Sequence, residues 1–130
     1  VPQYVHAAGV VVKERKVLLA QRPSKGLLGG MWEFPNGRFD AARNPAQELA
    51  KVLKAGYNLR LGAKRKVQEL GKFQHAYTHF KVTVHAFLCE LDSIPKAKNL
   101  KWVMLQDLAD YPMGKLDRQI ADTIMQRTRT

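Results

Sequence analysis

One helix with clearly marked ends separates two groups of short β-strands in this sequence. Asn44 suits the N-cap position, Pro45 suits the first helical position, and Gln47 stands three residues after the cap. The helix carries an apolar stripe formed by Leu49, Val52 and Leu53. Gly56 or Asn58 can end it, because both residues tolerate the left-handed backbone of a helix C-terminus.

Strand patterns surround this helix. Residues 10–12 and 17–19 are apolar and flank the polar segment 13–16, which predicts a β-hairpin. Apolar and polar side chains alternate over residues 80–88, and residues 100–104 form a further short strand. A final helix is indicated by Leu116, Ile120 and Ile124. We therefore predict one α+β domain over residues 1–130, with a mixed β-sheet packed between helices.

The segment before the first helix is rich in glycine and proline. Residues 22–30 read as a loop, and residues 31–34 as a short strand that follows it. Pro35, Asn36 and Gly37 then predict a turn, since Asn and Gly tolerate a positive φ.

The charge of the chain favours an anionic partner. It has 22 Lys and Arg against 11 Asp and Glu, a formal net charge of +11. Such an excess suits nucleic acid or nucleotides, although a soluble surface rich in basic residues would show the same count. Between residues 60 and 81 six basic residues accompany one acid, Glu69. Together with Arg60, the candidates for contacts with DNA phosphates are Lys64, Arg65, Lys66, Lys72 and Lys81.

Cysteine content and hydropathy indicate the compartment. Cys89 is the one cysteine, so the chain cannot form an internal disulfide or a cysteine-rich metal cluster. We expect Cys89 to be a small buried residue of a strand. No apolar run reaches the ~20 residues that a transmembrane helix needs, and no signal-peptide pattern is present. These features predict a cytoplasmic protein without a membrane partner.

The strand, the Trp-Glu-Phe-Pro segment and the helix resemble the Nudix hydrolase family, whose signature is G-x5-E-x7-R-E-U-x-E-E-x-G-U. The glutamates of that signature bind divalent cations. Gly37 matches its first glycine, but Arg43 replaces the first glutamate and Val52 the middle one. Ala55 and Gly56 replace the final pair.

Shifting the frame does not restore these ligands. With Glu48 at the middle glutamate, the final pair falls on Lys51 and Val52. We therefore predict a Nudix-like fold with no catalytic residue and no metal ligand, so that the chain alone is catalytically inert.

A closer resemblance joins the chain to the C-terminal domain of MutY-type adenine DNA glycosylases. It rests on Arg22-Pro23 with the segment 25–35, on the segment 74–80, and on Trp102 and Tyr111 in the last third, which we expect in the core. The resemblance implies a C-terminal domain of a longer glycosylase that removes adenine mispaired with 8-oxoguanine in base excision repair. Its implied partners are double-stranded DNA with that mispair and the N-terminal glycosylase domain of the same polypeptide. An iron–sulfur cluster is expected in that other domain, and no cofactor in this chain.

The same resemblance implies that Tyr77, Thr78 and His79 recognise 8-oxoguanine. An aromatic ring can stack or wedge at a base step, and the Thr78 hydroxyl can donate to or accept from a base edge. Alternation of His75, Tyr77 and His79 would also suit the half-buried face of an ordinary strand. Two other functions stay open: a free-standing pyrophosphohydrolase for oxidised nucleotides, and a non-catalytic module that binds protein or RNA.

Overall fold

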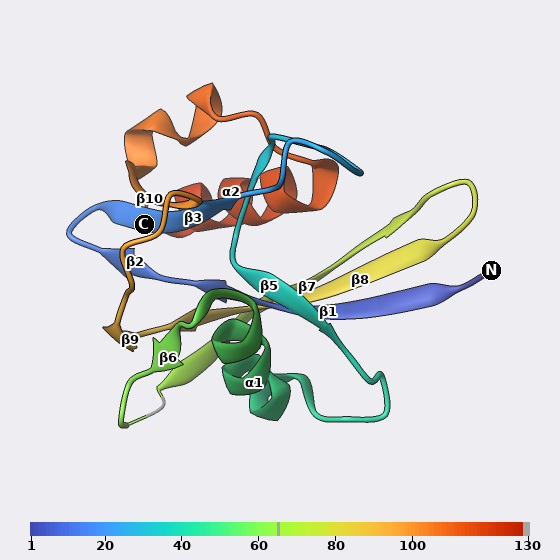
Figure 1. The fold of residues 1–130 in the computed structure, drawn as a ribbon, viewed down its shortest axis with the longest axis horizontal. Helices are drawn as coiled ribbons and strands as arrows, with labels where there is room; N and C mark the ends of the chain where they lie inside the picture. The colour runs from blue at the N-terminus through green and yellow to red at the C-terminus, as the bar shows by residue number, and fades with distance from the viewer. Residues whose placement is uncertain (65, 129–130) are drawn as a thin grey trace.

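The computed structural model describes residues 1–64 and 66–128. Two four-stranded sheets cross between two helices, and a two-stranded sheet lies at one end (Figure 1). The strands are β1 (Gln3–Val10), β2 (Val12–Lys13), β3 (Lys16–Gln21), β4 (Trp32–Glu33), β5 (Asn36–Phe39), β6 (Arg60–Leu61), β7 (Val67–Ala76), β8 (Lys81–Cys89), β9 (Leu91–Ser93) and β10 (Leu100–Met104). The helices are α1 (Pro45–Tyr57), the 3-10 helix η1 (Leu105–Asp110) and α2 (Lys115–Thr128). The predicted α+β class is confirmed.

The larger sheet is mixed, as predicted. Its order is β5-β1-β8-β7, with β1 parallel to β8 and the other pairs antiparallel. The second sheet has the order β10-β3-β2, and β4 pairs with β3. Its β2–β3 hairpin turns at Glu14 and Arg15, which have φ of 53° and 66° as a two-residue turn of type I′ requires. The predicted hairpin is therefore confirmed.

Each sheet has a buried cluster on both faces. One cluster joins α2 to the sheets through Phe34, Val84 and Ile120, and the other joins α1 through Leu49, Leu53 and Phe87. The alternation predicted for residues 80–88 is confirmed, because even-numbered residues of β8 such as Val84 contribute to the first cluster and odd-numbered ones to the second. Cys89 is buried, and burial raises the pKa of its thiol to about 12.

Helix α1 forms as its sequence predicts. The Asn44 side chain accepts hydrogen bonds from the backbone N–H groups of Ala46 and Gln47, at 3.0 and 3.3 Å. Asn58, with φ of 56°, ends the helix in the left-handed conformation. Of the two possible stops, Asn58 is therefore the one used.

The turn predicted at Pro35, Asn36 and Gly37 is wrong, because Asn36 and Gly37 open strand β5. Neither residue has a positive φ among the described backbone angles. Gly37 is needed for a different reason: a Cβ atom there would lie 2.7 Å from Cβ of Val52, so its absence lets α1 pack directly on β5. Asn36 is held by hydrogen bonds from its side-chain amide to the Glu33 carboxylate and to the Phe34 carbonyl.

Candidate functional site

The turn between β7 and β8 carries the three residues proposed to recognise 8-oxoguanine. The Tyr77 N–H donates to the Phe80 carbonyl over 2.7 Å and closes the turn. Thr78 and His79 are exposed, whereas Tyr77 is half-buried. Strand β7 ends at Ala76, so His79 does not belong to an alternating strand face, and the alternative interpretation fails for this residue. The turn projects beside the N-terminal end of β1, far from α1 and β6 (Figure 1).

A cluster of aromatic rings packs against the Tyr77 side of this turn. The Tyr77 ring stacks on Phe80, with ring centroids 4.7 Å apart and planes at 23°, and meets the His75 ring edge-on at 4.5 Å. Phe80 in turn contacts Tyr4, with centroids 5.8 Å apart, and the Arg38 guanidinium lies 4.3 Å from the centre of the Tyr4 ring. Insertion of the Tyr77 ring between bases would therefore require it to leave Phe80. Thr78 and His79 are the side chains that face solvent.

A cavity of about 390 Å³ opens under these rings. Tyr4, Tyr77 and Phe80 line one side, and Leu28 and Asp117 line the other. The opposite wall belongs to the loop 22–31 and to the start of α2. The cavity thus lies between the proposed recognition turn and the glycine-rich loop.

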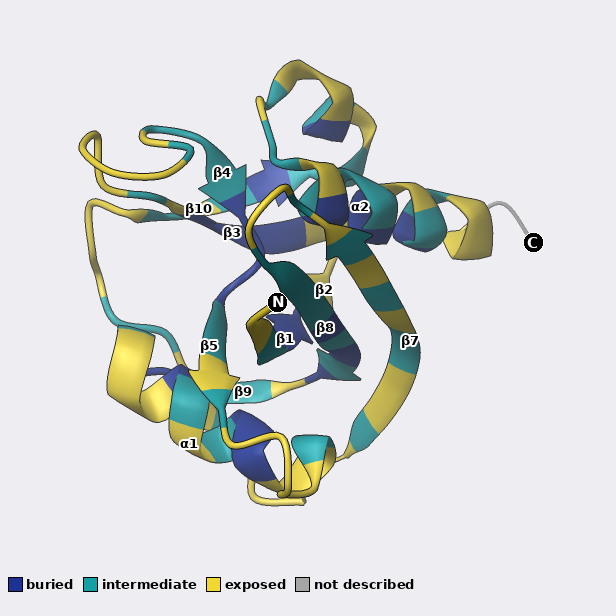
Figure 2. Ribbon diagram, turned by 90° about the vertical axis from the view of Figure 1, so that its right-hand side faces the viewer, coloured by how far each residue is buried: buried dark blue, intermediate teal, exposed yellow. Residues whose placement is uncertain are grey.

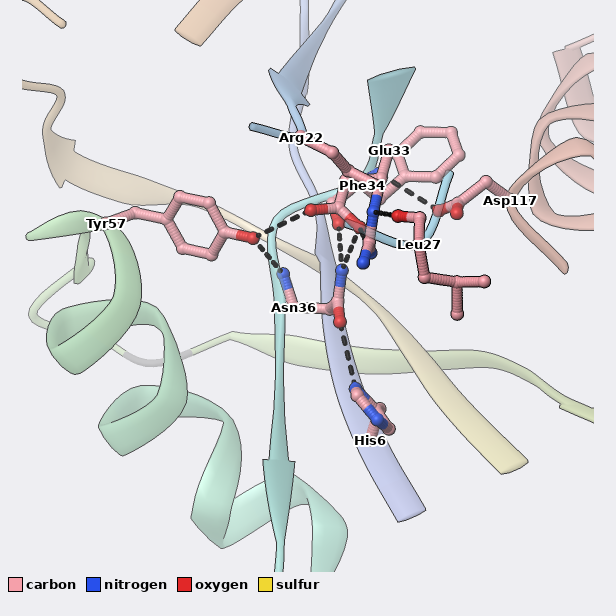
Figure 3. A network of polar contacts seen from close by, with 8 residues as sticks. All are labelled: His6, Arg22, Leu27, Glu33, Phe34, Asn36, Tyr57 and Asp117. Carbon is pink, nitrogen blue, oxygen red and sulfur yellow. Dashed lines mark hydrogen bonds and ion pairs between the residues drawn. The ribbon is translucent and has the colours of Figure 1, made fainter. Parts of the chain in front are cut away.

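A buried carboxylate, Glu33, lines this cavity and lies at the centre of a network of polar contacts (Figure 3). Arg22 Nη1 donates to Glu33 Oε1 over 2.9 Å, Asn36 Nδ2 donates to the same oxygen over 3.2 Å, and the Tyr57 hydroxyl donates to Oε2 over 3.4 Å. Glu33 thereby joins β4, β5, α1 and the end of β3 through their side chains. In the sequence Glu33 belongs to the Trp-Glu-Phe-Pro segment, but no spacing pattern joins it to Arg22 or to Tyr57, which lie 11 and 24 positions away.

Arg22 and Asn36 extend this network. Arg22 Nε donates to the Leu27 carbonyl over 2.9 Å, so the guanidinium also fixes the loop 22–31. Asn36 Nδ2 donates to the Phe34 carbonyl over 2.8 Å, and His6 Nδ1 lies 3.0 Å from Asn36 Oδ1, where the ring nitrogen donates. Burial lowers the pKa of His6 and raises the pKa of the Tyr57 hydroxyl to about 12. Both groups are therefore neutral at pH 7.

Asp117, at the start of α2, is the second acidic group of the cavity. Its Oδ1 accepts a hydrogen bond from the Phe34 backbone N–H over 3.1 Å. The residue as a whole is half-buried, but its carboxyl group is enclosed. Burial, reinforced by the nearby Glu33 carboxylate, raises the pKa of Asp117 to about 7. No motif in the sequence points to a role for Asp117.

In a Nudix hydrolase the helix that corresponds to α1 carries the cation ligands. The one buried acid of α1, Glu48, already forms ion pairs with basic side chains. The Glu48 carboxylate lies 3.7 Å from Arg43 Nε and 3.4 Å from Lys51 Nζ. Within residues 1–64 and 66–128 no three His, Cys, Asp or Glu side chains gather closely enough to hold a metal ion. The donor set of α1 thus does not fit a divalent cation.

The basic residues proposed to contact phosphates do not form one patch. Lys72 and Lys81 lie near the turn, in β7 and at the start of β8. Lys64 and Lys66 precede β7 and lie at its other end, which ten strand residues place about 33 Å away. Arg60, in β6, lies at that far end as well. Arg65 lies outside the described residues.

Comparison with known families gives a match over most of the chain. The model described as "NUDIX domain" matches residues 7–123. Among the helices of the described residues, none is long and apolar enough to cross a membrane.

Relatives include both glycosylases and nucleotide hydrolases. An adenine DNA glycosylase of Mus musculus is 35% identical over 112 residues, which are 80% of this chain and 21% of that protein. The chain therefore spans about a fifth of the length of that relative. An 8-oxo-dGTP diphosphatase of Proteus vulgaris is 46% identical over 48 residues, 36% of this chain and 43% of that one. Among solved structures, the C-terminal domain of mouse MUTYH, in complex with human PCNA, superposes with a TM-score of 0.74 at 22% identity, over 98% of this chain and 90% of that one.

Proposed function

The chain belongs to the NUDIX domain family, and on that premise we propose that it recognises 8-oxoguanine in DNA as a domain of an adenine DNA glycosylase. The whole enzyme would remove adenine mispaired with 8-oxoguanine, in base excision repair. This domain would bind the strand that carries the lesion, while the N-terminal glycosylase domain would extrude and cleave adenine. Similarity to glycosylases over 80% of the chain supports this assignment.

The observation that carries the proposal is the exposed turn at the tip of the β7–β8 hairpin. 8-Oxoguanine differs from guanine at its Hoogsteen edge, where N7 becomes a donor and C8 gains an acceptor oxygen. The Thr78 hydroxyl can donate and accept, so it can distinguish the two patterns. His79 would contact a phosphate, and Tyr77, packed on Phe80, would hold the turn in place.

No step of this function runs through a metal or a cluster in this chain. The iron–sulfur cluster expected of such a glycosylase needs several cysteine thiolates. This chain has one cysteine, which is buried in β8. The cluster would therefore belong to the catalytic domain. A cytoplasmic location stays a prediction.

Binding of the purified chain to matched duplexes tests the proposal. Fluorescence anisotropy with an 8-oxoguanine–adenine duplex and a guanine–adenine duplex, at several salt concentrations, should show tighter binding to the oxidised duplex. Equal affinity for both would contradict lesion recognition and leave only a basic surface. Affinity that does not change with salt would contradict DNA binding through phosphates.

Thr78→Ala is expected to lower the preference for 8-oxoguanine over guanine by about 1–3 kcal/mol, the range of a contact to a base edge. The same anisotropy titrations measure it as the ratio of the two dissociation constants. Ser93→Ala, which removes an exposed hydroxyl from β9, is the matched control and should leave the ratio unchanged. An unchanged ratio in Thr78→Ala would show that another group reads the lesion.

The rival function, hydrolysis of oxidised nucleotides, predicts a different result. We expect the purified chain with magnesium to hydrolyse 8-oxo-dGTP no faster than buffer does, because Arg43, Val52, Ala55 and Gly56 stand where the cation ligands belong. Release of pyrophosphate measures the rate. Magnesium-dependent turnover at enzymatic rates would make the domain a hydrolase and overturn the proposal.

A further inference from the structure

One face of the larger sheet is covered by α1 along only part of its length. Phe87 and Cys89 of β8 pack against Leu49 and Leu53 of α1. Side chains alternate along a strand, so Lys81, Thr83 and His85 continue the same face toward the turn. Figure 1 shows α1 beneath the left-hand part of this sheet, with the turn end of β7 and β8 extending beyond it to the right. We call this uncovered part the open sheet face; its polar side chains on β7 and β8 are Lys72, Gln74, Lys81, Thr83 and His85.

The strand register brings these residues into rows. Lys72 pairs with His85, Gln74 pairs with Thr83, and Lys81 lies in the next row opposite Ala76. Gln74 Nε2 donates to Thr83 Oγ1 over 3.2 Å, so the row between the two lysines carries hydrogen-bonding groups. Lys72 and Gln74 are exposed, and β7 alternates between exposed and half-buried residues along its length (Figure 2).

The two lysines of the open sheet face have no ion-pair partner among the described residues. Within residues 1–64 and 66–128, no carboxylate forms an ion pair with Lys72 or Lys81, whereas Arg22, Arg43 and Lys51 each have one. Burial, and secondarily the Lys72 charge, lower the pKa of His85, and the Glu69 carboxylate opposes this shift without reversing it. His85 is therefore neutral at pH 7 and offers a ring nitrogen as a hydrogen-bond donor. Two free ammonium groups with neutral donors between them complement a row of phosphates.

We propose that the open sheet face binds the sugar–phosphate backbone of DNA on one side of the lesion, with Lys81 and Lys72 on separate phosphates. The inference rests on the proposed function, because binding of the lesion at the turn determines where the DNA backbone meets the open sheet face. Lys81 comes directly after the turn, and Lys72 lies two rows further along. Four strand residues span about 13 Å, which is roughly the distance between two phosphates that lie about two nucleotides apart on one strand of a B-form duplex.

The distance from the turn determines which lysines can contact a short duplex. Lys64 and Lys66 lie at the far end of β7, about 33 Å from the turn, or about ten base pairs along a duplex. A duplex with fewer base pairs than that on either side of the lesion cannot reach them from the turn. Lys72 and Lys81 would then carry the phosphate contacts of a short duplex.

The test uses the whole chain and a 15-base-pair duplex with 8-oxoguanine at its centre. Lys72→Ala and Lys81→Ala should each weaken binding equally for oxidised and undamaged duplexes and lower the slope of log K against log salt by about 1. Lys98→Ala, which removes an exposed lysine from the loop before β10, is the charge-matched control and should leave the slope unchanged.

Neutral phosphates then locate the two contacts. A single methylphosphonate weakens binding where it removes a phosphate charge that a lysine contacts. In Lys81→Ala this effect should be lost at one position, and in Lys72→Ala it should be lost at a position about two nucleotides away. Normal slopes in both variants, with lesion preference retained by the unaltered chain, would overturn the open sheet face and leave the proposed function standing. Lower slopes without any lesion preference would support the surface and contradict lesion recognition. Absence of binding to either duplex would overturn both.

Discussion

Asp117→Asn is expected to make the protein more stable at pH 8 by about 2 kcal/mol, with no gain at pH 4. The pKa of Asp117 is raised to about 7 in the folded protein, against 3.8 for the ordinary group. A difference of that size corresponds to about 4 kcal/mol in an unscreened site. We expect about half of it, because the enclosed carboxyl group of Asp117 borders a cavity that opens to solvent, which screens its charge in part.

The sign follows from proton binding. Between pH 4 and pH 7 the folded state holds a proton on Asp117 that the unfolded state has lost, so the free energy of unfolding falls as the pH rises. Below pH 4 both states are protonated, and above pH 7 the full cost of a buried charge is present. Asn keeps an oxygen that can accept the Phe34 N–H and has no charge to bury.

Urea unfolding of the two proteins at intervals from pH 4 to pH 8 measures this difference. Asp122→Asn, which changes an exposed aspartate on the same helix, is the control and should alter the free energy of unfolding by less than about 0.5 kcal/mol at pH 8. A stability difference for Asp117→Asn that stays constant from pH 4 to pH 8 would show that its carboxyl group titrates normally.

The sequence predicted most of the fold because its signals are local. The cap at Asn44, the alternation in β8 and the spacing of Leu116, Ile120 and Ile124 each depend on neighbouring residues, and the structure confirms all three. The turn at residues 35–37 failed for the opposite reason. Gly37 looks like a turn residue, but its requirement comes from Val52, fifteen positions away, and no local rule contains that contact.

In the candidate site, too, local features could be predicted from the sequence, whereas contacts between distant residues could not. The turn at residues 77–79 could be located from a motif, but the motif did not show that the Tyr77 ring is stacked on Phe80 and that Thr78 is exposed. The basic residues between positions 60 and 81 are close together in the sequence, which predicted one surface for contacts with phosphates. A strand of ten residues separates them in space, so nearness along the chain was a poor guide. Glu33 belongs to the Trp-Glu-Phe-Pro segment, but neither its contacts nor those of Asp117 could be predicted, since their partners lie up to 83 positions away.

Glu33→Ala is expected to lower the free energy of unfolding by about 3 kcal/mol. Removal of a buried, paired carboxylate leaves its partners unpaired, which costs roughly 3–5 kcal/mol where the pair is fully enclosed. Here the Glu33 side chain is 12% exposed and that of Arg22 is 33% exposed, so we expect the lower end of this range. The Asn36 amide and the Tyr57 hydroxyl lose an acceptor at the same time.

The loss should be concentrated where Glu33 joins separate segments. Without its carboxylate partner Arg22 is less well fixed, and its Nε–H no longer holds the Leu27 carbonyl in one place. Amide hydrogen exchange should therefore quicken at Gly30, whose N–H donates to the Pro23 carbonyl, more than in the cores of β1 and β8.

Two further variants separate the network from the simple loss of a charge. Glu33→Gln keeps an oxygen for Arg22 and should cost less than Glu33→Ala, whereas Glu90→Ala removes an exposed carboxylate and should cost less than about 0.5 kcal/mol. Denaturant unfolding ranks the three proteins. If Glu33→Ala is no less stable than Glu90→Ala, the carboxylate does not hold β4, β5 and α1 together. The cavity between the loop and the turn would then owe its shape to apolar packing around Phe34, which is fully buried among the side chains of its cluster.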